Sequence, residues 1–457
     1  MRSREIPAHG KRLTWVLIFA MALTLMGCGE EQPVGPADRG LDSAGKPVSG
    51  DPVVNSTDPS GASPDTTLVV RVLGSGYDAG SVANFALDGQ TIPQVRTNST
   101  TYVSSRELRA NITIDADAPT DLYDVIVTTS KGKRGIGIEK FEVFITATPL
   151  GTLGGASFAT AVNRHGEVAG WSEYRRLSGR PHVFYWSALS GMEDLGEGGV
   201  GDISDAADIV GAQRSGSNFL QAVTWTRNGL GLWSMQVLPV PPGYKSDAHA
   251  ISPSGMYIAG SVGSSSPYEA PAVWTRSGGI WSISILPSSG SAVDVNDDGL
   301  VLVSGSRAVA IFQSGIWTLH QLAVPPDAPR GITVRTITRA GDVLGGTCCE
   351  QLEVRPLVWR RTSIGWSTAE EVPAIPPGSA VTGMNDAGYI SGAYIDSRGE
   401  WRAFLCCSGG LVDLGAPGGS TSIVHGIGPA GHVVGQSGSS GKAKAYLWTV
   451  PWAASPP

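Results

Sequence analysis

The stretch from Val162 to Gly170 reads VNRHGEVAG, and variants of it occur seven times in the chain. Each copy has one apolar residue, a polar turn and, in nearly every copy, a short apolar run that ends in glycine. The copies recur about every 44 residues, and they begin at Val162, Ile203, Ile251, Val295, Ile337, Met384 and Ile427. Turn residues at fixed positions between short apolar runs predict many short strands joined by tight turns.

In five of the seven repeats, a tryptophan follows the copy at a similar distance. The residues in this place are Trp186, Trp225, Trp274, Trp359 and Trp448, with Phe312 and Cys406 in the other two repeats. We interpret the tryptophans as packing between neighbouring repeats. A repeat of this length with four strands is typical of one blade of a β-propeller, so the sequence predicts a seven-bladed propeller over residues 148–457.

The last repeat ends shortly after Trp448 and lacks a final strand. A segment before the first repeat, Leu150–Gly155, matches the ends of other repeats at Leu195–Gly199 and Leu414–Gly419. We therefore expect the earlier segment to supply the missing strand of the last blade. This pairing closes the ring and leaves no long unpaired edge.

The N-terminus carries the features of an export signal. Basic residues precede an apolar run from Leu13 to Met26, which is shorter than the roughly 20 residues of a membrane span. The end of the run, Leu25-Met26-Gly27-Cys28, resembles the bacterial lipobox, which implies that residues 1–27 are removed and that Cys28 is lipidated. Because Gly29 follows, the outer membrane or cell surface is favoured over the inner membrane. The alternative is an ordinary secretory signal with an incidental cysteine.

Two segments precede the repeats. Residues 28–65 contain almost no large apolar side chains, so they predict a flexible linker. Residues 66–147 contain strand-like runs separated by turn residues. The turn Gly74–Tyr77 and the strand Leu122–Val127 resemble the IPT/TIG type of immunoglobulin-like domain; an unrelated small β-sandwich is the alternative. The expected fold class is all-β, a seven-bladed β-propeller preceded by a small Ig-like β-sandwich.

The repeats themselves resemble the bacterial extracellular HAF repeat. The matching segments are Asp413-Leu414-Gly415, Asn385–Gly388 and Ala403-Phe404-Leu405. Cys406 departs from the pattern, since the family has tryptophan there. The resemblance implies an exported, propeller-like protein, and the family carries no assigned reaction.

Composition narrows the function. The formal net charge is −7, and no basic run occurs after the export signal. Nucleic acid is therefore not an expected partner, because its binding depends on lysine and arginine at the phosphates. The chain also lacks the HExxH, GxSxG and P-loop motifs. No cofactor is predicted.

One position in the repeat is a candidate ligand site. Thr160, His249, Arg335, Thr382 and His425 each stand two residues before the first apolar residue of a copy. If the strands surround a channel, these residues form its wall, and the two histidines then bind a metal or another ligand. The alternative is that the histidines are isolated surface side chains.

Two further groups suggest chemistry. Cys348, Cys349, Cys406 and Cys407 lie in consecutive repeats, which favours a disulfide between blades five and six in an exported protein. A zinc site and free buried thiols are the alternatives. Asp294, Asn296 and Asp298 match the front of a calcium loop, but Gly305 stands where the bidentate glutamate belongs, so an ordinary turn is the alternative.

These features favour a lipid-anchored, non-enzymatic protein that binds or scaffolds at the cell envelope. Its expected partners are the membrane, through the lipid, and a protein or glycan ligand that the sequence does not identify. The alternative is a hydrolase or lyase that acts on a glycan at one mouth of the channel, since propeller enzymes assemble sites from several blades. The third hypothesis is a purely structural spacer in the cell envelope.

Overall fold

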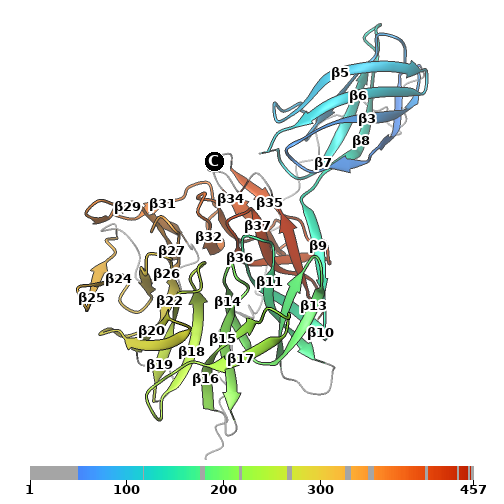
Figure 1. Cartoon of the computed structure of the whole chain (residues 1–457). Helices are drawn as coiled ribbons and strands as arrows, with labels where there is room; N and C mark the ends of the chain where they lie inside the picture. The colour runs from blue at the N-terminus through green and yellow to red at the C-terminus, as the bar shows by residue number, and fades with distance from the viewer. Residues whose placement is uncertain are drawn as a thin grey trace, which may run out of the picture. The chain divides into compact units, whose positions relative to one another are not determined.

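The computed structural model describes residues 50–116, 118–174, 181–215, 219–264, 270–324, 331–347, 355–406, 410–439, 442–450 and 453. The predicted export signal and Cys28 lie outside these residues. Within the described ranges every regular element is a β-strand (Figure 1), so the all-β class is confirmed. No helix in the described ranges is long and apolar enough to cross a membrane.

Two four-stranded sheets form an N-terminal β-sandwich with one shared core. In order across the sheet, the first contains β1 (Val53–Asp58), β3 (Thr66–Ser75), β6 (Glu107–Ile114) and β5 (Val95–Ser104). The second contains β2 (Gly61–Ala62), β8 (Arg134–Val143), β7 (Leu122–Thr128) and β4 (Val82–Ala86). Val72 and Leu108 from the first sheet meet Phe85 and Tyr123 from the second in this core.

The predicted linker boundary at residue 65 is wrong, because β1 and β2 already belong to the sandwich. β1 pairs with β3, and its Val54 and Thr57 are buried. Edge strands need few apolar residues, since backbone hydrogen bonds hold them to a neighbour, and this explains why composition alone did not reveal them. All strands in the described ranges lie between Val53 and Thr449, so a chain that begins at Ser49 keeps every one of them.

Seven further four-stranded antiparallel sheets follow in chain order, here called sheets 1 to 7. Sheet 1 contains β10 (Gly154–Val162), β11 (Val168–Tyr174), β12 (Pro181–Ser187) and β13 (Gly191–Glu197). Sheet 2 contains β14 (Gly199–Ile203), β15 (Ile209–Ser215), β16 (Phe219–Arg227) and β17 (Trp233–Val237). Sheet 3 contains β18 (Lys245–Ile251), β19 (Tyr257–Gly263), β20 (Ala270–Ser277) and β21 (Ile280–Ile285). Sheet 4 contains β22 (Ala292–Val295), β23 (Val301–Val303), β24 (Ala308–Gln313) and β25 (Ile316–Gln321).

The remaining sheets repeat this order. Sheet 5 contains β26 (Ile332–Ile337), β27 (Val343–Thr347), β28 (Pro356–Trp359) and β31 (Glu370–Glu371), with the small hairpin of β29 (Arg361–Thr362) and β30 (Gly365–Trp366) before β31. Sheet 6 contains β32 (Ala380–Met384), β33 (Ile390–Ile395), β34 (Trp401–Cys406) and β35 (Leu411–Asp413). Sheet 7 contains β36 (Thr421–Ile427), β37 (His432–Gly438), β38 (Lys444–Thr449) and, from earlier in the chain, β9 (Thr146–Gly151).

The first strands of the seven sheets form a closed ring. Each contacts the first strand of the next sheet, and β36 of sheet 7 contacts β10 of sheet 1 (Figure 1). β9 pairs with β38, with Thr146 opposite Thr449 and Gly151 opposite Ala445. The boundary predicted between residues 147 and 148 therefore falls inside β9, and the strand ends at Gly151 instead of continuing to Gly155.

The ring has no single core. Seven apolar clusters each join two neighbouring sheets. The tryptophans that end the third strands lie in these clusters, which confirms them as packing between sheets; Trp274, Trp359 and Trp448 are fully buried. Phe312 was assigned wrongly to this place, since it is 55% exposed and Ala310 pairs opposite Val301 instead.

A close approach of two backbones explains the glycine in the second strand of most sheets. A Cβ atom at Gly392 would lie 2.3 Å from the carbonyl oxygen of Ala380 in the first strand, and a Cβ at Gly435 would lie 2.0 Å from Ile423 O. Both distances are shorter than any contact that a real Cβ makes. The glycine therefore permits the tight pairing of first and second strands from which the ring is built.

Candidate functional site

A β-bulge occurs at the same place in the first strand of every sheet of the ring. In sheet 3, for example, Ala248 and Ala250 pair with consecutive residues of β19, and His249 between them has no partner in the ladder. The seven unpaired residues are Thr160, Gly201, His249, Val293, Arg335, Thr382 and His425. Bulges re-aim side chains, so this place in the repeat is set apart by the backbone itself.

All seven unpaired residues line one cavity of about 340 Å³ inside the ring. The five residues predicted for the channel wall (Thr160, His249, Arg335, Thr382 and His425) are therefore brought together, whereas Gly201 and Val293 occupy the same place in the other two sheets. The cavity extends to the turns between first and second strands, where Asn163, Asp205 and Asp386 contribute to its lining. A volume of this size suits a small ligand.

His249 belongs to a polar pair in sheet 3. Its Nδ1 lies 3.0 Å from the carbonyl oxygen of Ala292, so Nδ1 carries the proton and donates to that oxygen. Its Nε2 lies 4.0 Å from a carboxylate oxygen of Asp247. Burial raises the pKa of Asp247 above its ordinary value, while the charge of a protonated His249 opposes this rise. The pair thus places an imidazole and a carboxyl next to each other at the wall of the cavity.

His425, on the opposite side of the ring in sheet 7, is held in its neutral form. Burial lowers the pKa of its imidazole, although a hydrogen bond with Gln436 acts in the opposite direction. Its Nε2 is buried without a hydrogen-bond partner among the described residues. The two histidines are therefore not isolated surface side chains, which was the alternative prediction.

Arg335 and Thr382 offer the cavity different groups. The side chain of Arg335 is exposed, and the described residues provide it with neither a hydrogen bond nor an ion pair. The hydroxyl of Thr382 donates to the carbonyl oxygen of Ser391, 3.2 Å away. A free guanidinium beside imidazoles and hydroxyls is suited to a ligand that combines negative charge with hydroxyl groups.

Two buried carboxyls line the cavity: Asp202, which the sequence did not single out, and Asp294, which the sequence placed only in a candidate calcium loop. Asp202 accepts hydrogen bonds from Ile203 N and from Ile251 N of the next sheet, at 2.8 and 3.1 Å. Asp294 accepts in the same way from Val295 N at 2.8 Å and Ile337 N at 2.7 Å. Burial raises the pKa of Asp202 to about 6 and that of Asp294 to about 7. These carboxyls join sheet 2 to sheet 3 and sheet 4 to sheet 5.

Column-by-column alignment of the repeats reveals this pair of carboxyls. The residue before the first apolar residue of each copy is Ala161, Asp202, Ala250, Asp294, Thr336, Gly383 or Gly426. Aspartate among small residues at a position next to the predicted channel wall is the signal that marks them. Only two of the seven residues at this position carry a charge, and the position lies directly beside the one that holds the predicted wall residues.

The turn that follows also joins neighbouring sheets, which accounts for its asparagine. Asn296 Oδ1 accepts from Asp298 N and Leu300 N of its own turn, each at 3.1 Å. Asn296 Nδ2 donates to Thr338 O of the next sheet at 3.1 Å. Asn163 makes the corresponding bond to Ser204 O at 3.0 Å.

The contacts of this turn favour an ordinary turn over the calcium loop that Asp294, Asn296 and Asp298 suggested. Asp294 and Asn296 are engaged with sheet 5, and the carboxylate of Asp298 pairs with Arg361 at 3.0 Å. The three side chains therefore have separate partners and do not surround one point. In the described ranges no group of three or more histidine, cysteine, aspartate or glutamate side chains is placed to hold a metal.

Cys406 is disulfide-bonded. Cys348, Cys349 and Cys407 lie outside the described residues, so the predicted pairing between sheets 5 and 6 stays a prediction. Cys406 itself is 1% exposed in the cluster that joins these two sheets.

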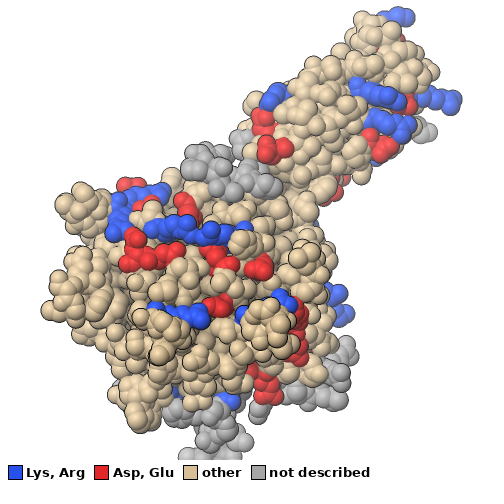
Figure 2. Space-filling model, viewed as in Figure 1, with Lys and Arg blue, Asp and Glu red and all other residues tan. Residues whose placement is uncertain are grey.

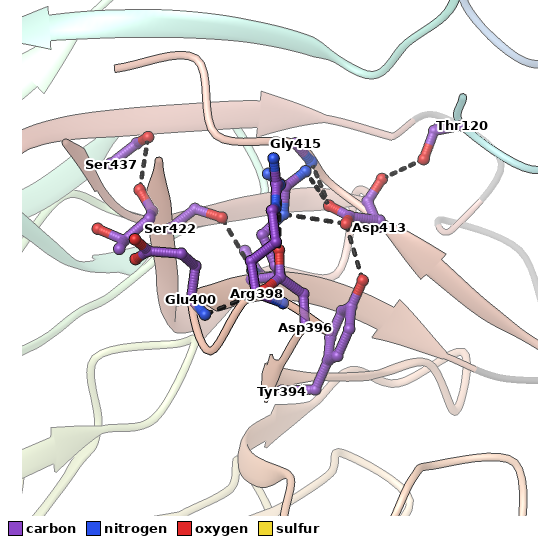
Figure 3. Close-up of polar contacts among 12 residues, drawn as sticks. Thr120, Tyr394, Asp396, Arg398, Glu400, Asp413, Gly415, Ser422 and Ser437 are labelled. Atoms are coloured by element: carbon purple, nitrogen blue, oxygen red, sulfur yellow. Dashed lines mark hydrogen bonds and ion pairs between the residues drawn. The ribbon is translucent and has the colours of Figure 1, made fainter. Parts of the chain in front are cut away.

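A second polar cluster, in sheet 6, is saturated by its own contacts (Figure 3). Asp413 accepts from Tyr394 Oη at 2.9 Å, from Arg402 Nε at 3.1 Å and from Gly415 N at 2.7 Å. Burial, followed by the charge of Asp413, raises the pKa of Tyr394 well above its ordinary value. Since each group already has a partner, this cluster stabilises the sheet and offers little to a ligand.

Comparisons with known proteins leave the function open. No protein-family model matches the chain, and no curated protein matches it. One similar solved structure is a post-proline cleaving enzyme from Rickettsia typhi, with 10% sequence identity and a TM-score of 0.31. The match covers 68% of this chain and 49% of that chain, so the present chain spans about half of its length. At this level of similarity the match carries no argument about activity.

Proposed function

We propose that the seven-sheet ring is a seven-bladed β-propeller of the HAF-repeat type, and that the chain is an exported, lipid-anchored protein which binds a small ligand at the cell envelope. The N-terminal sandwich, which we propose is Ig-like, then acts as a spacer. The closed contact between the first strands of sheets 1 and 7 supports the propeller, and the lipobox-like sequence at Cys28 supports the anchor.

The ligand that the cavity supports best is a small acidic sugar. The observation that carries this proposal is the row of seven bulges, whose residues Arg335, His249, His425, Thr160 and Thr382 all line one cavity of about 340 Å³. Arg335 pairs with the carboxylate of the ligand, and the neutral groups bind its hydroxyls. Each oxygen of Asp202 and Asp294 accepts a backbone N–H, and neither carboxyl forms an ion pair with Arg335 among the described residues.

Isothermal titration calorimetry of the chain from Ser49 onward tests this proposal. Glucuronate and galacturonate should bind, and glucose and galactose should bind at least about tenfold more weakly, because a charge-assisted pair is lost. Arg335→Gln should abolish this preference for the acids. Arg398→Gln is the matched control, since Arg398 is 72% exposed and pairs only with Asp396 of its own turn among the described residues. Equal binding by the Arg335→Gln variant, or no binding of either acid, would contradict the proposal.

A hydrolase or lyase acting on a glycan is the second candidate. It is favoured by the two carboxyls whose pKa burial raises to about 6 and about 7, since a general acid needs a pKa close to the working pH. In this case the Asp202→Asn and Asp294→Asn variants would still bind an oligosaccharide but would no longer cleave it. Release of reducing ends or of an unsaturated sugar by the wild-type chain decides between the two functions.

A further inference from the structure

The turns between the third and fourth strands of sheets 1 to 5 each expose a large apolar side chain. We call these residues the apolar rim: Leu189, Leu230, Leu232, Ile280, Ile316 and Ile364, which are between 63% and 100% exposed. The corresponding turn of sheet 6 includes residues outside the described ranges, and sheet 7 has no such turn because β9 supplies its fourth strand. The rim therefore covers every third-to-fourth-strand turn that is fully described.

The fold does not need apolar residues at these places. In sheet 4 the turn is made by Ser314 and Gly315, which have φ angles of 53° and 83°, and Ile316 only follows them. In sheet 3, Gly278 and Gly279 make the turn with φ angles of 55° and 82° before Ile280. None of the rim residues belongs to an apolar cluster of the ring. A polar residue would satisfy each turn equally well.

The rim residues share one side of the ring. In an antiparallel four-stranded sheet, the turn between strands three and four lies at the same end as the turn between strands one and two. The ring contacts arrange the five sheets as an arc, so their turns form a row of separate tips on one side. Single exposed apolar residues are ordinary, but one at the same position in five consecutive sheets is not scattered.

A tryptophan stands just behind the rim in four of these sheets. Trp233, Trp281, Trp317 and Trp366 follow Leu232, Ile280, Ile316 and, after one glycine, Ile364. The Arg227 guanidinium lies 5.6 Å from the ring of Trp233, and that of Arg276 lies 5.6 Å from the ring of Trp281. All four tryptophan rings pack against the apolar clusters between sheets, and Trp281 is only 6% exposed, so they hold the strands that carry the rim.

The arginines next to the rim are neutralised by acidic partners. Arg227 pairs with Glu193 at 3.4 Å, and Arg276 pairs with Asp208 at 2.9 Å. Figure 2 likewise shows basic and acidic side chains next to one another on the visible face of the ring. Contact through the rim would therefore depend on apolar burial more than on attraction to anionic headgroups.

We propose that the apolar rim inserts into the surface of a lipid bilayer and holds this side of the ring against the membrane. Separate tips on one side fit a flat apolar phase, whereas a peptide ligand would need a continuous groove. The proposal draws on the proposed lipid anchor, which keeps the ring near a membrane, but the rim acts without it. The cavity extends to the turns on the same side, so its opening then faces the headgroup layer.

Flotation with vesicles of phosphatidylethanolamine and phosphatidylglycerol tests the proposal on the chain from Ser49 onward, which lacks Cys28. The wild-type chain should float with the vesicles, and vesicles with brominated lipids should quench its tryptophan fluorescence. The double variant Leu230→Ser/Leu232→Ser should lower the partition coefficient at least about tenfold, since each leucine contributes through its burial. Binding should persist in about 1 M sodium chloride, where exposed charges are screened.

The matched control is Val69→Ser/Val103→Ser, which removes two apolar side chains of the sandwich that are 50% and 45% exposed. It should float like the wild type. Absence of flotation by the wild type, equal flotation by the rim variant, or release by salt would each overturn the proposal. Acidic-sugar binding by the rim variant, measured without vesicles, shows separately whether the cavity functions, because neither Leu230 nor Leu232 lines it.

Discussion

Substitution of Asp294 by asparagine tests the electrostatics of the ring. Burial raises the pKa of this carboxyl from 3.8 to about 7. Because the folded chain holds the proton more tightly than the unfolded chain, the stability it contributes is complete below pH 3.8 and is lost as the pH rises through 7. A shift of about three pKa units corresponds to at most about 4 kcal/mol.

The amide in the Asp294→Asn variant does not titrate, so this variant should not lose stability in the way that the wild type does as the pH rises through 7. The substitution also places an amide group opposite one of the two backbone N–H donors, Val295 N or Ile337 N, at a cost of about 1–3 kcal/mol that does not depend on pH. The wild type should therefore be more stable than the variant at about pH 4, and the gap should shrink or reverse by about pH 8.

Urea unfolding followed by tryptophan fluorescence measures this difference in stability. The signal reports on the ring, because no tryptophan occurs between Gly50 and Ile145 in the sandwich. Asp396→Asn is the control. The pKa of Asp396 is lowered by a hydrogen bond from Glu400 N, so its contribution to stability is lost only at acid pH. The difference in stability between the wild type and Asp396→Asn should therefore stay constant from about pH 5 to about pH 8. A constant gap for Asp294→Asn over the same range would refute the assignment.

Three further measurements address the joints between sheets. Asn296→Ala removes the hydrogen bond to the next sheet, leaves turn N–H groups without an acceptor, and should lower the free energy of unfolding in urea by about 1–3 kcal/mol. Trp359→Ala empties a fully buried site and should cost about 3–5 kcal/mol in the same assay. Peptide mapping without reductant should link Cys406 to Cys348 or Cys349; a link to its neighbour in sequence would contradict the predicted pairing.

The ring was largely predictable because its determinants are local and repeated. Each copy specifies its turn through asparagine or glycine, five of the seven repeats specify their packing through tryptophan, and the copies reinforce one another. The missing final strand of the last repeat was visible for the same reason. In sheet 4, by contrast, Ala310 occupies the tryptophan position, and the nearest aromatic residue, Phe312, was chosen in error.

The candidate site was predictable only in part. Its wall residues follow from a shared column of the repeats, and His249 and Arg335 were found in this way. The bulges that give this column its special backbone depend on the register between two strands, which composition does not state. The roles of Asp202 and Asp294 were also hidden, because each depends on a backbone N–H group of the neighbouring sheet.

The joint between β9 and β38 also determines how the ring carries mechanical load. β9 is the one strand of sheets 1 to 7 that enters the ring from the N-terminal side, and paired residues from Thr146 to Gly151 attach it to β38. Tension applied through the N-terminal part of the chain reaches the ring through this strand first. A pull along the strand axis loads the hydrogen bonds of the joint together, whereas a pull across it breaks them one after another. The joint that completes the circle is therefore also the place where sufficient force opens it.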